Sequence, residues 1–286
     1  MTAGIRRDRW IRRLNPGGEP RFRLICLHCA GSGPGMFREL PDHLPADVSV
    51  EAVLLPGREN RIAERPYDRM GPLVEDLADA LGPRLDLPYA FFGYSMGAQV
   101  SYHLTHALRD RGLPLPRALF VAASPGPYLQ REVPAWNESD DSLVAYLRDL
   151  GGTAQNVLDD PDLLDLLLPT LRADLTVVAT RPYRARPALP MAVRAFSGAE
   201  DGPASPERMG AWRMETLGAF RQTVLPGGHF FITGSLPAVA GTIASDLAEL
   251  PGPCAGDAAA DTVRAADRTP GIQTPVPVRP YRLETP

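Results

Sequence analysis

Short runs of apolar residues, separated by turn residues and by longer amphipathic stretches, mark the first 250 positions of the chain. Apolar runs of about four to eight residues bounded by Gly, Pro or Asp are typical of buried β-strands. Turns such as Pro56-Gly57 end several of them. The predicted strands are Trp10–Leu14, Arg21–Leu27, Val48–Leu55, Tyr89–Phe92, Ala118–Ala123, Met191–Phe196 and Phe220–Leu225.

Helical periodicity lies between several of these strands. Leucines recur at every fourth position from Leu73 to Leu85, with acidic residues off that stripe, which predicts an amphipathic helix covering a sheet. Positions Ala98–Arg109 carry a second helical pattern. Strands that alternate with helices imply a mostly parallel sheet with helices on both faces, so the predicted fold class is α/β.

One long stretch breaks this alternation. Between Ala123 and Met191 the pattern predicts helices over Asp141–Leu150 and Pro161–Leu168 and no convincing strand. An insertion of this size after a central strand, over about residues 128–187, is interpreted as a helical cap over the carboxyl ends of the strands, where ligands bind in open α/β sheets. Its leucines could form a small core, line an acyl channel, or do both.

Composition and charge argue against several classes of function. The chain has 286 residues, 44% of them apolar, and a formal net charge of −4, so we expect no nucleic-acid partner. No apolar run approaches the length of a membrane span, so we expect no membrane association. The arginine-rich start lacks an apolar core and is not interpreted as a secretory signal.

The chain contains three cysteines, Cys26, Cys29 and Cys254. This sparse, odd set argues against a disulfide framework and predicts a cytoplasmic protein. Cys26 and Cys29 have the spacing of a redox or zinc pair, but they stand at the end of a strand, and no second pair supports a metal site. We interpret both as packing residues and expect no metal.

The character of the chain changes after Pro251. Pro, Ala, Asp, Thr and Arg dominate residues 251–286, and hydrophobic periodicity stops. We predict a single folded domain over residues 1–250 and a disordered tail over 251–286.

The pentapeptide Gly93-Tyr94-Ser95-Met96-Gly97 carries the strongest chemical signal. It follows a predicted strand and opens a predicted helix, which is the context of a nucleophile elbow. A serine at a helix N-cap would explain the hydroxyl but not both glycines. Ser95 is therefore the candidate nucleophile.

A serine nucleophile needs a base and an acid that orients the base. In an α/β hydrolase these residues follow the serine in the order acid, then histidine. His103 and His106 lie on the helix behind the elbow, so His229, in the loop after the last strand, is the candidate base. The loop after the preceding strand offers Glu200 and Asp201, and Asp201 is favoured because a turn holds a shorter side chain better.

An oxyanion hole requires two backbone N–H donors. Met96, at the N-terminus of the elbow helix, is the first candidate. The loop after the strand Arg21–Leu27 supplies the second, and Ala30 is the favoured donor.

Several segments resemble the type II thioesterases, stand-alone α/β hydrolases that accompany polyketide synthases and nonribosomal peptide synthetases. The resemblance runs from about Trp10 to Glu249. Beside the elbow, the segments are Cys29-Ala30-Gly31, Leu55-Pro56-Gly57-Arg58 with Arg61, Leu168-Pro169-Thr170-Leu171-Arg172-Ala173-Asp174 and Pro226-Gly227-Gly228-His229-Phe230. The Pro-Gly-Arg and Leu-Arg-Ala-Asp segments discriminate best, because ordinary lipases and esterases lack them.

The resemblance implies an α/β-hydrolase fold and a serine hydrolase that removes acyl groups from the phosphopantetheine arm of acyl or peptidyl carrier domains. Ser95 would be the nucleophile, His229 the base and Asp201 the acid, with Ala30 and Met96 as oxyanion donors. The implied substrate is an acyl thioester, with no cofactor of the enzyme's own, and we expect a monomer. The chain departs from the family pattern at Cys29, at Tyr94, where His is usual, and at Gly202, where proline often follows the acid.

Other functions stay open at this stage. The same triad would serve a product-releasing thioesterase or an acyltransferase, and a catalytically silent carrier-binding module is a third reading. Arg58, Arg61 and Arg65 follow the second long strand on the loop side of the sheet. We hypothesise that some of them meet an acidic carrier or its phosphate, although Arg58 could instead be structural.

Overall fold

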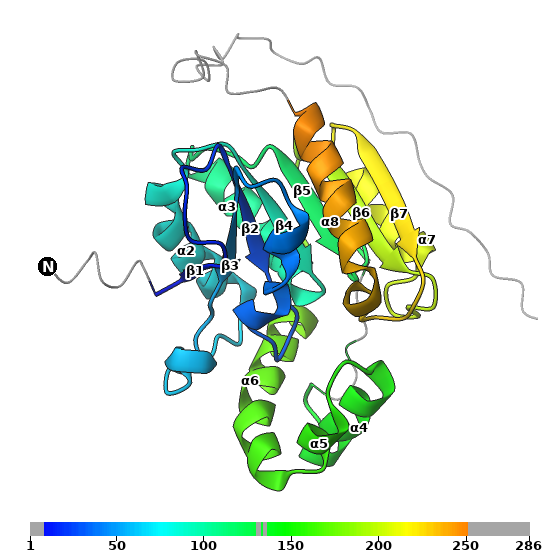
Figure 1. Cartoon of the computed structure of the whole chain (residues 1–286). Helices are drawn as coiled ribbons and strands as arrows, with labels where there is room; N and C mark the ends of the chain where they lie inside the picture. The colour runs from blue at the N-terminus through cyan, green and yellow to red at the C-terminus, as the bar shows by residue number, and fades with distance from the viewer. Residues whose placement is uncertain (1–8, 130–132, 134–135, 251–286) are drawn as a thin grey trace, which may run out of the picture. The chain divides into compact units, whose positions relative to one another are not determined.

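The structure is a computed structural model that describes residues 9–129, 133 and 136–250. Its centre is a seven-stranded sheet with the order β1-β3-β2-β4-β5-β6-β7 (Figure 1). Neighbouring strands are parallel except β1, which is antiparallel to β3. The strands are β1 (Ile11–Arg13), β2 (Phe22–Leu27), β3 (Val48–Val53), β4 (Tyr89–Tyr94), β5 (Ala118–Ala122), β6 (Ala192–Gly198) and β7 (Phe220–Leu225). The predicted tail over 251–286 and Cys254 lie outside the described residues.

Alternate strand residues pack against opposite layers of the fold. In β2, Ile25 and Leu27 join one apolar core and Leu24 and Cys26 join the other, as the period of two in a strand requires. Both faces are covered, so the inner strands β4 and β5 are buried along their whole length, whereas the edge strands β1 and β7 carry polar residues.

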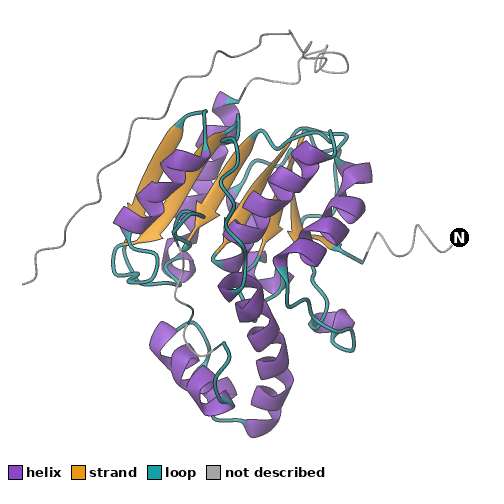
Figure 2. Cartoon of the chain, turned by 180° about the vertical axis from the view of Figure 1, so that it is seen from behind, coloured by secondary structure: helices purple, strands orange, loops and turns teal. Residues whose placement is uncertain are grey.

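Helices α2 (Met70–Leu81) and α3 (Met96–Asp110) cover one face of the sheet, which is turned toward the viewer in Figure 2. The predicted leucine stripe of α2 is buried, but the α-helix ends at Leu81, and a 3₁₀ turn (Gly82–Arg84) leads to a buried Leu85. Helix α8 (Ile232–Glu249) covers the other face with two short 3₁₀ helices, Pro34–Phe37 and Leu40–His43. The short helix α7 (Pro206–Gly210) and a 3₁₀ helix (Ala211–Glu215) link β6 to β7.

A helical cap follows the central strand β5. Its helices are α4 (Asp140–Leu150), α5 (Gln155–Leu158) and α6 (Pro161–Ala179), and they lie at the edge where the strands end (Figure 1). Ser139 and Asp160 cap the first turns of α4 and α6 by accepting backbone N–H groups, which satisfies donors that have no helical partner. Sequence correctly predicted an insertion at this place in an α/β sheet.

Helix α6 is longer than predicted. The sequence pattern predicts a helix over Pro161–Leu168, and proline within a helix lacks an N–H and its ring crowds the preceding turn. The helix instead continues through Pro169 to Ala179. Buried side chains beyond the proline, among them Leu171 and Asp174, anchor this second half to the sheet domain.

Among the described residues, no helix is both long enough and apolar enough to cross a bilayer.

Candidate active site

Ser95 stands at a sharp turn between β4 and α3. Its backbone has φ 53° and ψ −110°, a combination outside the regions that non-glycine residues normally occupy and one that costs of order 1–3 kcal/mol. The Ser95 N–H donates to the Ala122 carbonyl oxygen at 2.8 Å, which ties the turn to the neighbouring strand β5. The predicted elbow is therefore present, with its backbone held in place by the sheet.

The glycines on both sides of Ser95 are required by close backbone approaches. A Cβ atom on Gly97 would lie 1.9 Å from the Leu27 carbonyl oxygen, and one on Gly93 would lie 2.4 Å from the Gly97 oxygen. No side chain fits at either distance. The pairing of Leu27 with Gly93 also places the loop after β2 beside the elbow.

His229 joins Ser95 to Asp201. Its Nε2 lies 3.0 Å from Ser95 Oγ, and its Nδ1 lies 2.9 Å from Asp201 Oδ2. All three residues are buried. The other carboxylate oxygen of Asp201 accepts the Ala204 N–H at 3.0 Å, which fixes the orientation of the carboxylate. The structure thus brings together the three residues predicted from the sequence, which follow β4, β6 and β7.

Glu200, the alternative acid, is exposed. Its backbone N–H donates to the Gly227 carbonyl oxygen at 3.0 Å, so the loop that carries the acid is bonded to the loop that carries His229. These loops touch closely, since a Cβ on Gly198 would lie 2.3 Å from the Gly227 oxygen.

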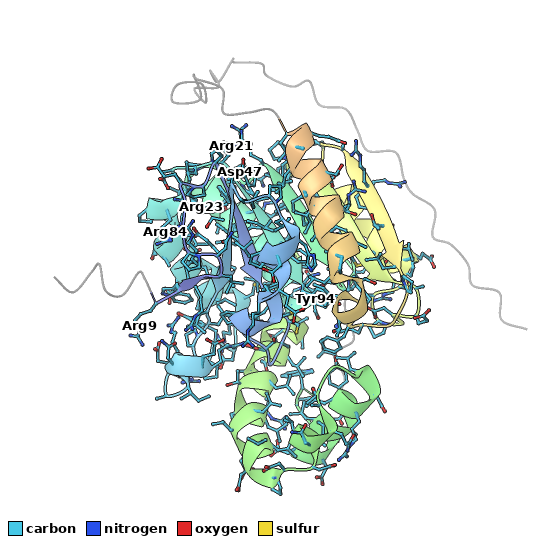
Figure 3. The ribbon with its side chains drawn as sticks, viewed as in Figure 1. Arg9, Arg21, Arg23, Asp47, Arg84 and Tyr94 are labelled. Atoms are coloured by element: carbon cyan, nitrogen blue, oxygen red, sulfur yellow. The ribbon has the colours of Figure 1, made fainter. Side chains whose placement is uncertain are left out.

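Tyr94 supports His229 from the elbow side. Its hydroxyl donates to the His229 carbonyl oxygen at 2.5 Å, and its ring stands edge-on to the imidazole, with centroids 6.3 Å apart. Burial raises the pKa of Tyr94, so the hydroxyl remains protonated and able to donate at neutral pH. Figure 3 shows Tyr94 at the cap end of the sheet, far from Arg21, Arg23 and Asp47 at the opposite edge.

The predicted oxyanion donors, Ala30 and Met96, line the same cavity as Ser95. Within the described part of the chain, neither N–H has a hydrogen-bond acceptor. That is expected for Met96, since the first N–H groups of a helix have no partner within it. Both N–H groups are therefore available to a ligand.

A buried ion pair holds the loop that contains Ala30. Arg58 Nη2 donates to Asp174 Oδ1 at 2.9 Å and Arg58 Nη1 donates to Asp174 Oδ2 at 2.9 Å. Asp174 Oδ2 also accepts the Gly31 N–H at 2.9 Å, and Arg58 Nη1 donates to the Ser32 carbonyl oxygen at 2.7 Å. One cluster therefore joins the loop after β2, the loop after β3 and helix α6.

A cavity of about 290 Å³ lies between the triad and the cap. Ser95, His229 and Ala30 line it, together with the polar residues Ser32, Tyr146 and Thr153. The lining contains no Asp, Glu, Lys or Arg side chain among the described residues. Its apolar wall is formed by Met96, Leu147, Leu150, Leu167, Leu171, Leu175, Val178 and Phe230. The cap leucines thus belong both to the core and to the channel.

Phe230 connects the cap to the histidine loop. Its ring stands edge-on to the His229 imidazole, with centroids 5.3 Å apart. A Cβ on Gly152, in the turn between α4 and α5, would lie 2.3 Å from Phe230 Cδ2. The cap therefore packs directly on the residue beside His229.

Two ionisable neighbours of the site are held neutral. Burial, with the Arg58 charge as the second cause, lowers the pKa of His28 to about 3. Burial raises the pKa of the Cys29 thiol to about 11. Cys26 and Cys29 are free and buried, as predicted, although Cys29 also lines the cavity.

The structure gives structural contacts to two of the three arginines in the carrier hypothesis. Arg58 is bonded to Asp174, and Arg61 is buried between Glu64 and the ring of Trp10, whose centroid lies 4.5 Å from the guanidinium carbon. Neither guanidinium is available at the surface. Of the three, Arg65 is exposed, with 88% of its side chain accessible, so the carrier hypothesis now rests on Arg65.

Sequence reasoning missed the functional contacts of Tyr94, Phe230 and Asp174. The Pro-Gly-Arg and Leu-Arg-Ala-Asp segments stand out in the sequence, but neither indicates that the two segments are in contact. His103 and His106 lie on α3 and do not join the site, as predicted, and His106 is buried. The described residues contain no cluster of three or more His, Cys, Asp or Glu side chains able to hold a metal ion.

Residues 22–247 match the profile of the thioesterase domain. The chain belongs to the thioesterase family. This thioesterase is 33% identical to the gramicidin S biosynthesis protein GrsT of Aneurinibacillus migulanus over 237 residues, which cover 81% of the chain and 91% of that protein. The resemblance to type II thioesterases and the α/β-hydrolase fold are thereby confirmed, and the protein is an enzyme that hydrolyses thioesters.

Solved structures agree with this assignment. The thioesterase is similar to the type II thioesterase BorB from the borrelidin biosynthetic cluster, with a TM-score of 0.77, 36% identity and coverage of 83% of this chain and 97% of that one. It is similar also to RedJ, the thioesterase of the prodiginine pathway in Streptomyces coelicolor, with a TM-score of 0.76, 40% identity and coverage of 81% and 90%.

Proposed function

We propose that this thioesterase hydrolyses acyl groups from the phosphopantetheine arm of carrier domains in a polyketide or nonribosomal peptide pathway. The observation that carries the proposal is the hydrogen-bonded chain Ser95–His229–Asp201 beside a largely apolar cavity that is also lined by cap residues. The relatives from gramicidin S, borrelidin and prodiginine biosynthesis support the choice of pathway. Ser95 is the nucleophile, His229 the base and Asp201 the acid.

In the acylation step, Ser95 Oγ attacks the thioester carbonyl carbon while His229 Nε2 takes the hydroxyl proton. The carbonyl oxygen becomes an oxyanion, which the N–H groups of Ala30 and Met96 stabilise. The carbon–sulfur bond then breaks, His229 gives its proton to the leaving sulfur, and the acyl group remains on Ser95. Asp201 holds the Nδ1–H tautomer of His229 and stabilises the transient imidazolium.

In the deacylation step, water replaces the thiol. His229 takes a proton from the water, whose oxygen attacks the acyl carbon, and the second oxyanion occupies the same site. The bond between that carbon and Ser95 Oγ breaks, and Oγ recovers the proton. The balance is thioester plus water giving carboxylic acid plus thiol, and we expect no cofactor to take part.

The cavity wall favours acyl groups without charge. A carboxylate carried into it would lose its hydration and meet no cationic side chain from the lining. Alkyl and other uncharged acyl groups should therefore be cleaved faster than acyl groups that end in a carboxylate.

The test compares one uncharged acyl group on a carrier protein and on a small thiol. We expect a higher kcat/KM on the carrier, with part of the gain lost on adding salt, because exposed charges act mainly on the encounter rate. Ser95→Ala should abolish both activities and labelling by a serine-reactive phosphonate. Equal kcat/KM on the two substrates would contradict the carrier assignment and favour a general esterase.

Two charge reversals sharpen this comparison. Arg65 is exposed on the loop after β3 and Arg21 is exposed at the opposite edge of the sheet, and each is paired with an aspartate. Arg65→Glu should lower kcat/KM for the carrier substrate only, whereas Arg21→Glu should leave both values unchanged. Transfer of the acyl group to an added alcohol or amine, in place of hydrolysis, would indicate a product-releasing role instead.

A further inference from the structure

Side chains from other segments form hydrogen bonds with two consecutive residues of the loop that carries Ala30. The Gly31 N–H donates to Asp174 Oδ2 at 2.9 Å, and the Ser32 carbonyl oxygen accepts from Arg58 Nη1 at 2.7 Å. Within the loop, the Ser32 N–H donates to the Cys29 carbonyl oxygen at 3.3 Å. Ala30 therefore lies inside a turn whose direction depends on the two external side chains.

These side chains are buried and bonded to each other. Arg58 is 7% exposed and Asp174 is 2% exposed. Their two parallel hydrogen bonds, both 2.9 Å, have the fork geometry that guanidinium and carboxylate form together. Each holds the other in one rotamer, and Arg58 is held further by the Pro56 carbonyl oxygen at 3.3 Å.

Helix α6 is also pressed against the same loop. Gly31 has φ +71°, and a Cβ there would lie 3.0 Å from Leu171 Cδ1, which belongs to the helical turn before Asp174. Thr170 Oγ1 donates to the Gly57 carbonyl oxygen at 2.7 Å, next to Arg58. Steric contact and hydrogen bonds thus link the cap helix, the loop after β3 and the loop with Ala30.

We propose that Arg58 and Asp174 are positioning residues that aim the Ala30 N–H at the oxyanion. The inference rests on the proposed function, in which Ala30 supplies that donor. An oxyanion donor acts only if it is already oriented when charge develops on the substrate oxygen.

The test uses Asp174→Asn, which keeps the side-chain shape but removes the charge, and Arg58→Lys, which removes the fork. Misplacing a reacting group by about 1 Å costs about 10²-fold. We expect kcat to fall about 10²-fold in each variant, with KM changed less than about threefold. Affinity for a trifluoromethyl ketone, which forms an oxyanion on addition of Ser95, should fall in parallel, while affinity for the neutral carboxamide analogue of the substrate should not.

A second arginine–aspartate ion pair serves as a control that distinguishes an effect on catalysis from an effect on stability. Arg194 of β6 and Asp246 of α8 form two hydrogen bonds of 2.6 Å in a partly buried site away from the cavity. Asp246→Asn and Arg194→Lys should lower Tm but leave kcat and ketone affinity unchanged. If Asp174→Asn lowers Tm yet leaves kcat and ketone affinity as in these controls, the inference is overturned.

A double variant covers the case in which single variants fold poorly. Replacing a buried ion pair by apolar residues of similar size is often neutral for stability, so Arg58→Met with Asp174→Leu should recover Tm. It cannot restore the bonds to Gly31 and Ser32, so kcat should stay low. Recovery of kcat with Tm would show that the pair only stabilises the fold. Lack of wild-type thioester hydrolysis or phosphonate labelling would instead reject the proposed function.

Discussion

Tyr94 precedes Ser95 directly and donates its hydroxyl hydrogen to the carbonyl oxygen of His229 at 2.5 Å. The elbow thus holds the backbone of the base, in addition to the hydrogen bond between the two side chains. Tyr94→Phe removes this one bond and leaves the ring in place. We expect kcat to fall about tenfold, because the imidazole is less well placed, with KM nearly unchanged.

Tyr89 provides the control for this variant. It lies on the same strand, is equally buried, and donates to the Pro114 carbonyl oxygen at 2.7 Å, at the end of β4 away from the cavity. Tyr94→Phe should cost about 1–3 kcal/mol of unfolding free energy, because the buried His229 carbonyl oxygen loses its donor, and Tyr89→Phe should cost about 1 kcal/mol, because its acceptor lies on the exposed Pro114. Only Tyr94→Phe should lower kcat; equal kcat in the two variants would contradict a positioning role for Tyr94.

The choice between the adjacent acids gives a second prediction at this scale. Asp201→Asn should reduce kcat by about 10⁴-fold, because an amide no longer selects the Nδ1–H tautomer of the base. Glu200→Gln should leave kcat within about twofold, since the Glu200 side chain is exposed and surface changes have small effects. Steady-state hydrolysis of one small thioester measures both, and the reverse ranking would show that the wrong acid was assigned.

Site residues whose signal lies within one short segment could be predicted from the sequence, whereas contacts between distant segments could not. Ser95 could be predicted because its glycines and the flanking strand and helix all lie within one segment. His229 followed from chain order and from elimination of His103 and His106. The bond between Arg58 and Asp174 could not be predicted, because it joins residues separated by 116 positions and either side chain alone would suit a surface.

At the scale of elements, the turn between α4 and α5 allows a comparison of two adjacent glycines. Gly151 and Gly152 have φ of +73° and +84°, so an alanine at either position is strained. A Cβ on Gly151 would meet no atom within 4 Å, whereas one on Gly152 would overlap the ring of Phe230. Only the second substitution therefore reaches the cavity.

We predict that Gly151→Ala and Gly152→Ala both lower the free energy of unfolding by about 1 kcal/mol or more, because alanine disfavours positive φ. Gly152→Ala should also lower kcat/KM for a small thioester about tenfold, because Phe230 must move beside His229. Urea denaturation and steady-state kinetics measure the two effects. Unchanged kcat/KM in Gly152→Ala would contradict this prediction, because it would mean that the turn adjusts without moving Phe230 and His229.

In helix α6, tertiary contacts outweigh the local tendency of proline to end a helix. Proline within a helix removes one hydrogen bond and crowds the preceding turn, so Pro169 disfavours the observed continuation beyond the predicted end at Leu168. Contacts of Thr170, Leu171 and Asp174 with Gly57, Gly31 and Arg58 lie beyond the proline and stabilise the helical conformation there. These contacts join residues more than one hundred positions apart. A prediction from local sequence pattern considers only neighbouring residues and therefore cannot detect them.

At the scale of the whole molecule, buried neutral histidines link stability to pH. Burial is the main cause that lowers the pKa of His28 and His106 to about 3 and that of His103 to about 4. The His106 Nδ1 faces Arg109 at 2.9 Å, and Arg186 adds a second positive charge, while Asp110 acts in the opposite direction. These imidazoles therefore stay neutral in the folded state at pH values where an unfolded chain would protonate them.

Stability should consequently fall as the pH drops below about 6.5, because the unfolded state then binds more protons than the folded state. Glu215, which accepts from the Tyr102 hydroxyl, has a raised pKa and acts with the opposite sign. We expect Tm to fall between pH 7 and 5 and the slope to be shallower in His106→Asn, whose amide oxygen can still accept from Arg109. An unchanged slope in that variant would exclude His106 as a source of the acid sensitivity.

The order of the strands has a consequence for the time at which the site forms. Ser95, Ala30 and Met96 lie just after β2 and β4, Met96 as the first residue of α3, whereas Asp201 and His229 follow β6 and β7, on the far side of the cap in the sequence. A ribosome completes the elbow more than one hundred residues before it supplies the base. In the proposed mechanism, the serine of a nascent chain therefore lacks its base until β6 has paired with β5 and β7 has paired with β6. Reactivity of Ser95 toward a phosphonate thus reports the last stage of sheet assembly.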